Sequence, residues 1–418
     1  MIGILLGRWF RGQNTCNWSV LENRDIIVMS GDWNRMNPGC VQRVTVPLAR
    51  RNRVVWVSGV PIRAPRARIR DFQRIMDKGF KMLMSTTNSR NTSIPVTEIH
   101  PFFVPFYDNP VFRRFNDRLL RSSVLKKIQE LRFKNYLVIP TNPMVAGVIH
   151  TLAESSSHYI CTDDYAANVG AFKCLGRLEH DLLQKVDSCF STSHVLMNMK
   201  IPRSGENHFI SQGVDIDHFK VTGAPPPDAL AHLRRPIVGY YGLLESWVDY
   251  ELIVRCAVAY PRVSFVVIGE AKTDVSMLRR QSNIILLDHV PYENLPRYAE
   301  MFDVGLIPRR INRLTVAMNP IKLLEYLALE LPVVSTNLPE VKRFGDLAFV
   351  AESHEEFVQL IGEALKDNSP ARRRLRRAEA ERFSWDSVAD GVSEVMREID
   401  ERKSRERNLS ISSEADAS

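Results

Sequence analysis

Short apolar runs alternate with amphipathic stretches along most of the chain. In the first half, the runs predicted to be strands lie at residues 25–30, 54–58, 136–140, 158–161, 188–193 and 208–212. Helical patterns separate several of them, at residues 39–50, 110–133 and 143–153. A strand, a glycine-bearing turn, a helix and a second strand form a βαβ unit with parallel strands. This half is therefore predicted to be a doubly wound α/β domain.

The second half starts the same pattern again. The apolar runs predicted to be its strands lie at residues 237–241, 264–268, 284–287, 304–307, 333–335 and 348–350. Residues 222–227 read Thr-Gly-Ala-Pro-Pro-Pro, a stiff segment that cannot join a sheet and suits a linker. The pattern predicts two α/β domains, each with its own parallel sheet.

Composition agrees with two globular domains. The chain has 418 residues, of which 44% are hydrophobic and 25% are charged, so it is large enough for two complete cores. No apolar run approaches the roughly 18 to 20 residues of a membrane span. Arg8 and Arg11 follow the short apolar N-terminus, so no secretory signal is expected. The six cysteines are scattered, which favours a reducing cytoplasm over a disulfide framework or a zinc site.

The net charge of +8 points to an anionic partner. Nucleic acid is not expected, because the arginine clusters lack the patterns of known nucleic-acid binders. Nucleotide diphosphates and anionic membrane surfaces remain. The helix predicted at 110–133 does not decide whether a membrane surface is the partner. Its apolar side and its flanking cations, such as Arg113 and Arg114, suit an interfacial helix as well as a core-packed one.

The stretch that begins at Asn319 carries the clearest chemistry. Asn319 is predicted to cap a helix whose first residue is Pro320. Lys322 then lies in the first turn, where a cation opposes the helix dipole unless an anion is bound there. Glu325, one turn later, has the reach to accept hydrogen bonds from ribose hydroxyls. The alternative is that Lys322 and Glu325 form only the solvated face of an amphipathic helix.

A longer motif surrounds these residues. It runs Pro320-x-Lys322-x-x-Glu325-Tyr-Leu-Ala, then Leu331-Pro-Val-Val-Ser-Thr and Leu338-Pro-Glu. The motif resembles the donor-site signature of GT-B glycosyltransferases of family 4 (group 1), and most of all the branch with teichuronic-acid and exopolysaccharide enzymes. The resemblance implies an α/β fold of two Rossmann-like domains that face a cleft. It also implies that Glu325 holds the nucleotide ribose, while the loop and helix start hold the diphosphate.

The same resemblance assigns further residues. Asp163 and Asp164 follow a strand of the first domain, where they are either turn residues of the loop or, as the resemblance implies, acceptor-side catalytic groups. Gly242 ends the first strand of the second domain, and His289 with Val290 matches the turn that meets the base. The sequence departs from the family at Ala317, where many members have glutamate, and at 243–249, where a cation pair is usual.

These assignments complete the predicted domain organisation. We expect an acceptor-side domain at 1–220, a linker at 221–236 and a nucleotide-sugar-binding domain at 237–382. A terminal helix at 383–402 is expected to return to the first domain, and the charged, serine-rich residues 403–418 are expected to be disordered.

The sequence therefore predicts a retaining glycosyltransferase that moves a sugar from a nucleotide diphosphate, preferably a UDP-sugar, to a polysaccharide or lipid-linked acceptor. No metal or other cofactor is expected. The expected location is the cytoplasm, with peripheral attachment at the inner face of the plasma membrane as an open question. Two alternatives remain, a nucleotide-sugar epimerase on the same fold and a non-catalytic binding subunit. Oligomeric state is not predicted.

Overall fold

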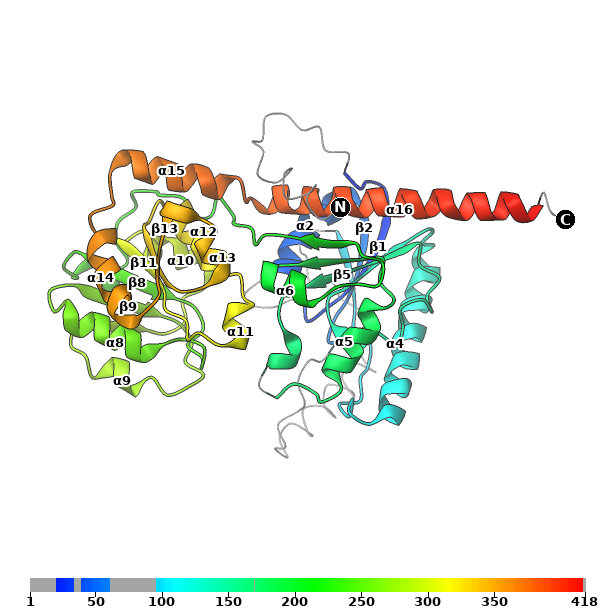
Figure 1. The fold of residues 1–418 in the computed structure, drawn as a ribbon, viewed down its shortest axis with the longest axis horizontal. Coiled ribbons are helices and arrows are strands. Elements are labelled where there is room, and N and C mark those ends of the chain that lie inside the picture. Colours follow the sequence, from blue (N-terminus) through cyan, green and yellow to red (C-terminus); the bar gives the residue numbers. More distant parts are fainter. Residues whose placement is uncertain (1–19, 34–38, 61–94, 169, 416–418) are drawn as a thin grey trace. The chain divides into compact units, whose positions relative to one another are not determined.

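The computed structural model describes residues 20–33, 39–60, 95–168 and 170–415, the last five without their side chains. The chain divides into two compact units, one of residues 1–210 with 389–418 and one of residues 211–388 (Figure 1). Each unit is built on one parallel sheet. The predicted fold class, α/β with two doubly wound parallel sheets, is confirmed.

The sheet of the first unit has the strand order β3-β2-β1-β4-β5-β6-β7, and every neighbouring pair is parallel. Its strands are β1 (Asp25–Met29), β2 (Arg53–Val57), β3 (Val96–Ile99), β4 (Leu137–Pro140), β5 (Ser156–Cys161), β6 (Ser188–Ser191) and β7 (Asn207–Phe209). Strand β3 was not predicted, because its Val-Thr-Glu-Ile sequence is short and carries no apolar run. The order reverses between β1 and β4, which is where doubly wound sheets bind ligands.

The helices of the first unit are α2 (Cys40–Arg51), α4 (Pro110–Leu131), α5 (Leu175–Leu183), α6 (His194–Met199) and most of α16 (Trp385–Ala415), with 3-10 turns η1 (Pro143–Val145) and η2 (Tyr165–Ala167). The prediction of a helix at 143–153 is wrong. The chain there makes η1 and then a series of turns. His150 and Ala153 have left-handed φ angles of 69° and 61°, which an α-helix does not contain.

Helix α16 differs from the prediction at its end. Residues 403–415 were expected to be disordered, but they continue the helix as far as Ala415. Lys403 forms an ion pair of 2.7 Å with Asp187, and Arg402 forms one of 2.8 Å with Glu206. These cations reach carboxylates of the first unit, which explains why the charged sequence is ordered at least at its start.

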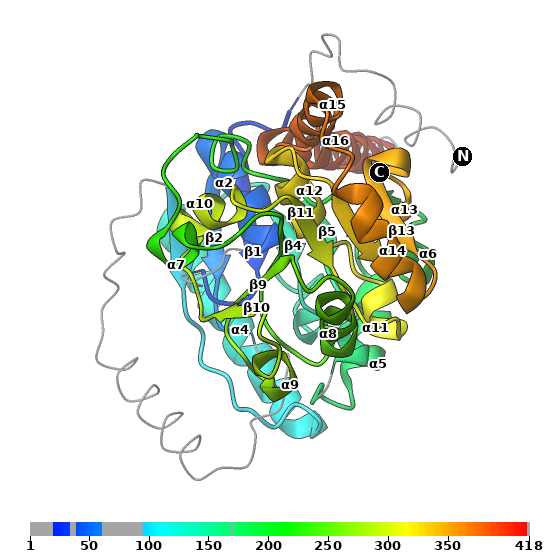
Figure 2. The same cartoon turned by 90° about the vertical axis from the view of Figure 1, so that its left-hand side faces the viewer.

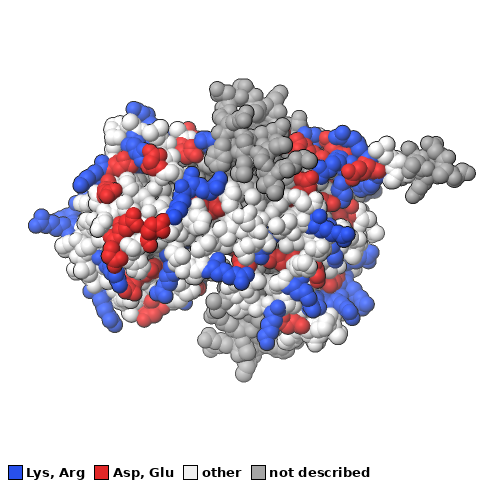
Figure 3. All heavy atoms as spheres, viewed as in Figure 1, with Lys and Arg blue, Asp and Glu red and all other residues white. Residues whose placement is uncertain are grey.

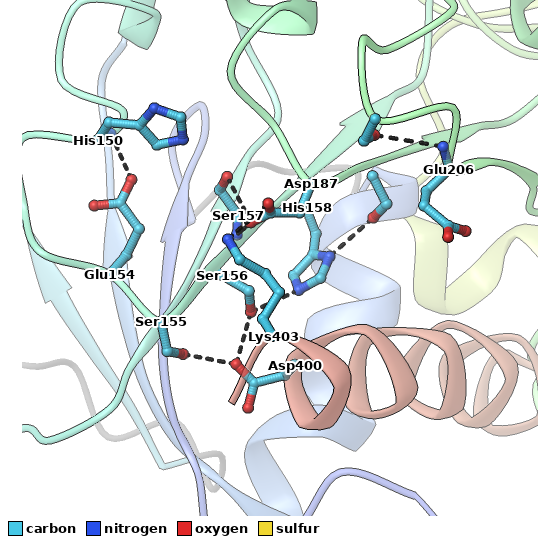
Figure 4. Close-up of polar contacts among 12 residues, drawn as sticks. His150, Glu154, Ser155, Ser156, Ser157, His158, Asp187, Glu206, Asp400 and Lys403 are labelled. Carbon is cyan, nitrogen blue, oxygen red and sulfur yellow. Dashed lines mark hydrogen bonds and ion pairs between the residues drawn. The ribbon is translucent and has the colours of Figure 1, made fainter. Parts of the chain in front are cut away.

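Asp400 is the buried polar anchor of α16 (Figure 4). Its Oδ1 accepts hydrogen bonds from the hydroxyls of Ser155, at 2.8 Å, and Ser156, at 2.9 Å. Its Oδ2 lies 2.5 Å from the Arg24 guanidinium. Ser156 also contacts the buried ring of His158 at 3.0 Å, and burial lowers the pKa of that histidine to about 4. The helix is thus held to β5 by a charged group as well as by packing.

The sheet of the second unit has the order β10-β9-β8-β11-β12-β13, again all parallel. Its strands are β8 (Ile237–Tyr241), β9 (Ser264–Ile268), β10 (Ile284–Leu287), β11 (Val304–Ile307), β12 (Val333–Thr336) and β13 (Ala348–Ala351). All of them were predicted to within one residue at either end. They are buried apolar runs, which are the clearest strand signal in a doubly wound sheet.

Helices cover both faces of this sheet (Figure 2). They are α7 (Asp228–Ala231), α8 (Tyr250–Ala259), α9 (Ser276–Arg279), α10 (Leu295–Ala299), α11 (Arg313–Val316), α12 (Ile321–Ala328), α13 (Pro339–Lys342), α14 (His354–Ala364) and α15 (Pro370–Glu381), with 3-10 turns η3 (Tyr292–Asn294) and η4 (Gly345–Leu347). Because strand side chains alternate, Ile237 and Tyr241 join one core with α10 and α12, while Val238 and Tyr240 join the other with α8 and α14.

The anchoring of α16 predicts a stability effect. Asp400→Ala leaves the Arg24 charge and two serine hydroxyls without their acceptor, so we expect the free energy of unfolding to fall by about 2 to 4 kcal/mol. Asp390→Ala is the matched control on the same helix, because its ion pair with Arg51 is more exposed and is worth about 0 to 1 kcal/mol. Urea unfolding of both variants measures the difference, and equal losses would contradict the anchor.

Candidate functional site

The strand order of the second unit reverses between β8 and β11, so the carboxyl ends of these strands are the expected place for a ligand. Gly242 follows β8 with a φ of +137°. A Cβ atom on Gly242 would lie 2.4 Å from Cε of Lys322, and one on Gly269 would lie 1.9 Å from the carbonyl oxygen of Gly242. Glycine is therefore required at both positions for the chain and the lysine to come this close.

Lys322 reaches this point from the first turn of α12. Its Nζ lies 6.0 Å from the ring centroid of Tyr240 and 5.8 Å from that of Tyr241. Burial and the nearby charge of Arg309 lower the pKa of Lys322 to about 8, and the Glu325 carboxylate opposes this only in part. An ammonium with a pKa this low lacks adequate compensation for its charge.

Arg309 is the second cation, two residues beyond the end of β11. Its backbone N–H donates to the hydroxyl of Thr336 at 3.2 Å, and its guanidinium lies 5.8 Å from the ring of Trp247. Its Nη1 is buried and makes no hydrogen bond. Among the residues that the structure describes, no carboxylate forms an ion pair with Arg309 or Lys322. Arg309 therefore lies near enough to Lys322, at the switch point of the sheet, for its charge to lower the pKa of that lysine.

Glu325 lies one turn along α12 from Lys322. Only 6% of its surface is exposed, and its Oε2 accepts a hydrogen bond of 2.9 Å from the hydroxyl of Tyr241. Burial and the Glu325 charge raise the pKa of Tyr241 well above its ordinary value, so the phenol keeps its proton and donates it. The interpretation of Glu325 as part of a solvated helix face is wrong. The carboxylate is held in a fixed orientation beneath the switch point.

The start of α12 differs by one residue from the prediction. Pro320, not Asn319, occupies the capping position, and the helix begins at Ile321. Proline has no polar side chain, so α12 lacks a side-chain cap. Lys322 is then the second residue of the helix.

The loop before α12 is well ordered by its own hydrogen bonds. Asn312 caps α11 by accepting from the backbone N–H groups of Leu314 and Thr315, and the Thr315 hydroxyl donates to Arg310 O at 2.5 Å. Ala317 is 1% exposed. The position at which many members of the family have glutamate is therefore buried in this loop.

His289 and Val290 follow β10, which is separated from β8 by one strand. Val290 packs partly against the core on the α12 side of the sheet. Nε2 of His289 is buried and has no hydrogen-bond partner in the structure. These residues lie at the same edge of the sheet as Gly242, but no described contact joins them to Lys322 or Glu325.

In the first unit, Asp163 and Asp164 follow β5 but lie in different surroundings. Asp164 is 1% exposed and lies 3.2 Å from Nζ of Lys200, which also contacts Glu179 at 2.5 Å. Burial alone would lower the pKa of Lys200, but the Glu179 carboxylate raises it, so the lysine stays charged. The hydroxyl of Tyr159 donates to Glu179 at 2.8 Å. Asp164 therefore belongs to a buried charge network that fixes the loop.

Asp163 is partly exposed at the edge of this network. Its carbonyl oxygen accepts a hydrogen bond of 3.0 Å from the backbone N–H of Tyr165. The Tyr165 hydroxyl contacts Thr162 at 2.8 Å and donates to Thr141 O at 2.9 Å, next to the switch point of this sheet. Of the two carboxylates, Asp163 is therefore the more accessible one.

Comparisons with known proteins agree with this arrangement. Residues 235–367 match the family described as glycosyl transferases group 1. The matched residues lie within the second unit, which is therefore similar to group 1 glycosyl transferases. A putative teichuronic acid biosynthesis glycosyltransferase of Bacillus subtilis, TuaH, is 29% identical over 203 residues, which cover 44% of this chain and 51% of that protein. The match thus spans about half the length of the curated relative. The predicted relationship to group 1 and teichuronic-acid transferases is confirmed.

Solved structures extend the likeness over both units. Sucrose-phosphate synthase of Thermosynechococcus elongatus has a TM-score of 0.68 at 14% identity, over 90% of this chain and 99% of that one. HepE of Anabaena, solved with UDP-glucose, has a TM-score of 0.61 at 13% identity over the same shares. Identities this low show the fold alone, which is GT-B.

Sequence reasoning missed two groups of residues near the candidate sites. Arg309 follows a strand, directly before Arg310 and outside the quoted motif, so no spacing marked it. Lys200 is far in sequence from Asp164 and Glu179, and only the fold brings the three together.

Proposed function

We propose that the protein transfers a sugar from a nucleotide diphosphate donor to a polysaccharide or lipid-linked acceptor, with retention of configuration. The observation that carries this proposal is the pair of cations, Lys322 and Arg309, at the switch point of a domain similar to group 1 glycosyl transferases. A diphosphate between them would remove their repulsion and provide acceptors for the buried Nη1 of Arg309. Arg309 would take the place of the cations that are absent from 243–249.

The same arrangement suits the chemistry of transfer. When the bond between the anomeric carbon and the diphosphate oxygen breaks, the electron pair leaves with the diphosphate and its negative charge grows. Lys322 and Arg309 would stabilise that charge, and the glycine at 242 lets the Lys322 stem approach the strand end. The nucleophile is an acceptor hydroxyl that attacks the anomeric carbon from the face that the diphosphate leaves, as retention requires. Its proton goes to a base, the role proposed for Asp163.

A UDP-sugar is the preferred donor. HepE of Anabaena was solved with UDP-glucose and, in another crystal, with UDP and glucose, and an Escherichia coli structure of the same fold was solved with UDP-2-fluoro glucose. In this assignment Glu325, oriented by Tyr241, accepts from the ribose hydroxyls. Val290 and His289 border the base, and the segment at Asn319 and Pro320 adjoins the phosphates. The likeness to TuaH supports a cell-envelope polysaccharide as the product.

The low pKa of Lys322 predicts how UDP binding responds to pH. Lys322 must be protonated to pair with the diphosphate, so the affinity should be highest below about pH 8 and fall above it. The fall approaches about tenfold per pH unit, because each binding event then takes up one proton. Calorimetric titration of UDP between pH 6.5 and 9.5 measures the profile.

Lys322→Arg is the matched control for this prediction, because a guanidinium stays protonated throughout the range. Its affinity should be nearly independent of pH. A flat profile for the natural protein, or the same decline in the arginine variant, would show that Lys322 does not hold the diphosphate.

The two aspartates are predicted to differ in their effects. Asp163→Asn should lower the rate of sugar transfer by at least about a hundredfold, the scale of a lost general base, and leave UDP affinity and stability nearly unchanged. Asp164→Asn should instead lower the free energy of unfolding by about 1 to 3 kcal/mol, because it leaves the Lys200 charge partly unpaired. Transfer assays with unfolding curves separate these effects, and full turnover in Asp163→Asn would remove that residue from the mechanism. An epimerised sugar formed from the donor alone would instead indicate an epimerase.

A further inference from the structure

The protein carries charged side chains of both signs over much of its surface. Figure 3 shows lysine and arginine mixed with aspartate and glutamate over the face that it draws, and no helix in the described part of the chain is long and apolar enough to cross a membrane. Several exposed cations of the second unit pair with carboxylates, as Arg255 does with Glu251. Arg309 differs from them, because it is partly buried and its guanidinium lies beside the ring of Trp247.

The loop after β8, residues 243–249, runs beside the segment that follows β11. The backbone N–H of Asp249 donates to the carbonyl oxygen of Pro308 at 2.9 Å. The N–H of Arg310 donates in the other direction, to the carbonyl oxygen of Trp247 at 3.0 Å. These two bonds form a short antiparallel pairing that fixes the backbone of both segments.

Arg309 lies in the middle of this pairing, opposite the buried Val248. Its own N–H donates to the Thr336 hydroxyl of β12 at 3.2 Å, so its backbone is held from both sides. The side chain is placed differently, because its buried Nη1 makes no hydrogen bond. The neighbour found for the guanidinium is the Trp247 ring, whose centroid lies 5.8 Å away. At this distance the face of an indole attracts a cation.

The carboxylates of the same loop are engaged with other partners. Asp249 caps α8, and its Oδ2 lies 3.0 Å from Nε2 of His354. The Glu245 carboxylate accepts a hydrogen bond of 2.8 Å from the N–H of Ser246. Within the described residues neither carboxylate forms an ion pair with Arg309. The loop therefore offers this cation an aromatic ring in place of a counter-charge.

We propose that Trp247 is a positioning residue for the diphosphate, because its ring holds the Arg309 guanidinium near Lys322. This inference rests on the proposed function. An aromatic ring suits the task, because it attracts the guanidinium without cancelling its charge, whereas a carboxylate in its place would neutralise the cation and repel a diphosphate. The loop after β8 thus acts on the diphosphate without a cation of its own.

Calorimetric titration of UDP at pH 7 tests this role. Trp247→Leu and Trp247→Met should each weaken UDP binding by about fivefold or more, the scale of a partly desolvated contact between a cation and an aromatic face. Trp247→Phe keeps an aromatic face and should restore the affinity to within about twofold of the natural protein. Urea unfolding of the same variants shows that they are folded. Full affinity in the leucine and methionine variants would overturn the proposal.

A double-mutant cycle separates positioning from a general structural role. If Trp247 acts through Arg309, then Trp247→Leu should change UDP affinity by less than about twofold in a protein that already carries Arg309→Gln. The same loss in both backgrounds would show that the tryptophan acts by another route, and would overturn the proposal.

Tyr260→Leu is the matched control. Tyr260 and Trp247 are both partly buried and pack against the same core, but Tyr260 ends α8 while the loop precedes that helix. The control should bind UDP like the natural protein, and equal losses in both leucine variants would trace the effect to the core and refute the role of Trp247.

The variants also separate this inference from the proposed function on which it rests. A loss of UDP affinity in Arg309→Gln without a loss in Trp247→Leu would overturn the role of the tryptophan alone. Unchanged affinity in Arg309→Gln would contradict both the role of Trp247 and the proposed diphosphate site.

Discussion

The burial of the Lys322 ammonium near a second cation, Arg309, is the constraint on which the candidate site of the second unit depends. Two like charges in partly buried positions destabilise a protein unless something compensates them. Here the only nearby carboxylate with a described effect on Lys322, that of Glu325, also accepts a hydrogen bond from Tyr241 and compensates the lysine only in part. The fold keeps both cations in place all the same. A charge that is kept without full compensation at the carboxyl ends of strands is typical of a binding site rather than of a structural ion pair.

The backbone makes this arrangement possible through close approach. Gly242 and Gly269 let two strand ends and the Lys322 stem share a space in which side chains would collide. The capped turn at α11 and the tightly packed Ala317 hold the loop before α12, so Lys322 enters from a fixed direction. The parallel sheet then delivers Arg309 from β11 to the same edge. Each part is ordinary for a doubly wound domain, and their combination brings two cations to the edge of the sheet where we propose that the diphosphate binds.

Much of this could be predicted from the sequence, for reasons visible in particular residues. Buried parallel strands such as β8 and β12 are continuous apolar runs, and the motif around Lys322 and Glu325 is local in sequence. Arg309, Lys200 and the Tyr241 bond to Glu325 depend on contacts between distant segments, which no local pattern encodes. The same limit explains α4, whose apolar residues divide between the core and the surface only once the packing of Asn116 is known.

The most direct test of the anion site is the unfolding free energy of Lys322→Met, measured with and without UDP. Methionine keeps the length of the stem and removes the charge, so it relieves the repulsion with Arg309. The account predicts that the variant is more stable than the natural protein without ligand, and that saturating UDP then stabilises it much less, because stabilisation by a ligand follows its affinity. A variant that is less stable without ligand and gains as much from UDP as the natural protein would contradict the account.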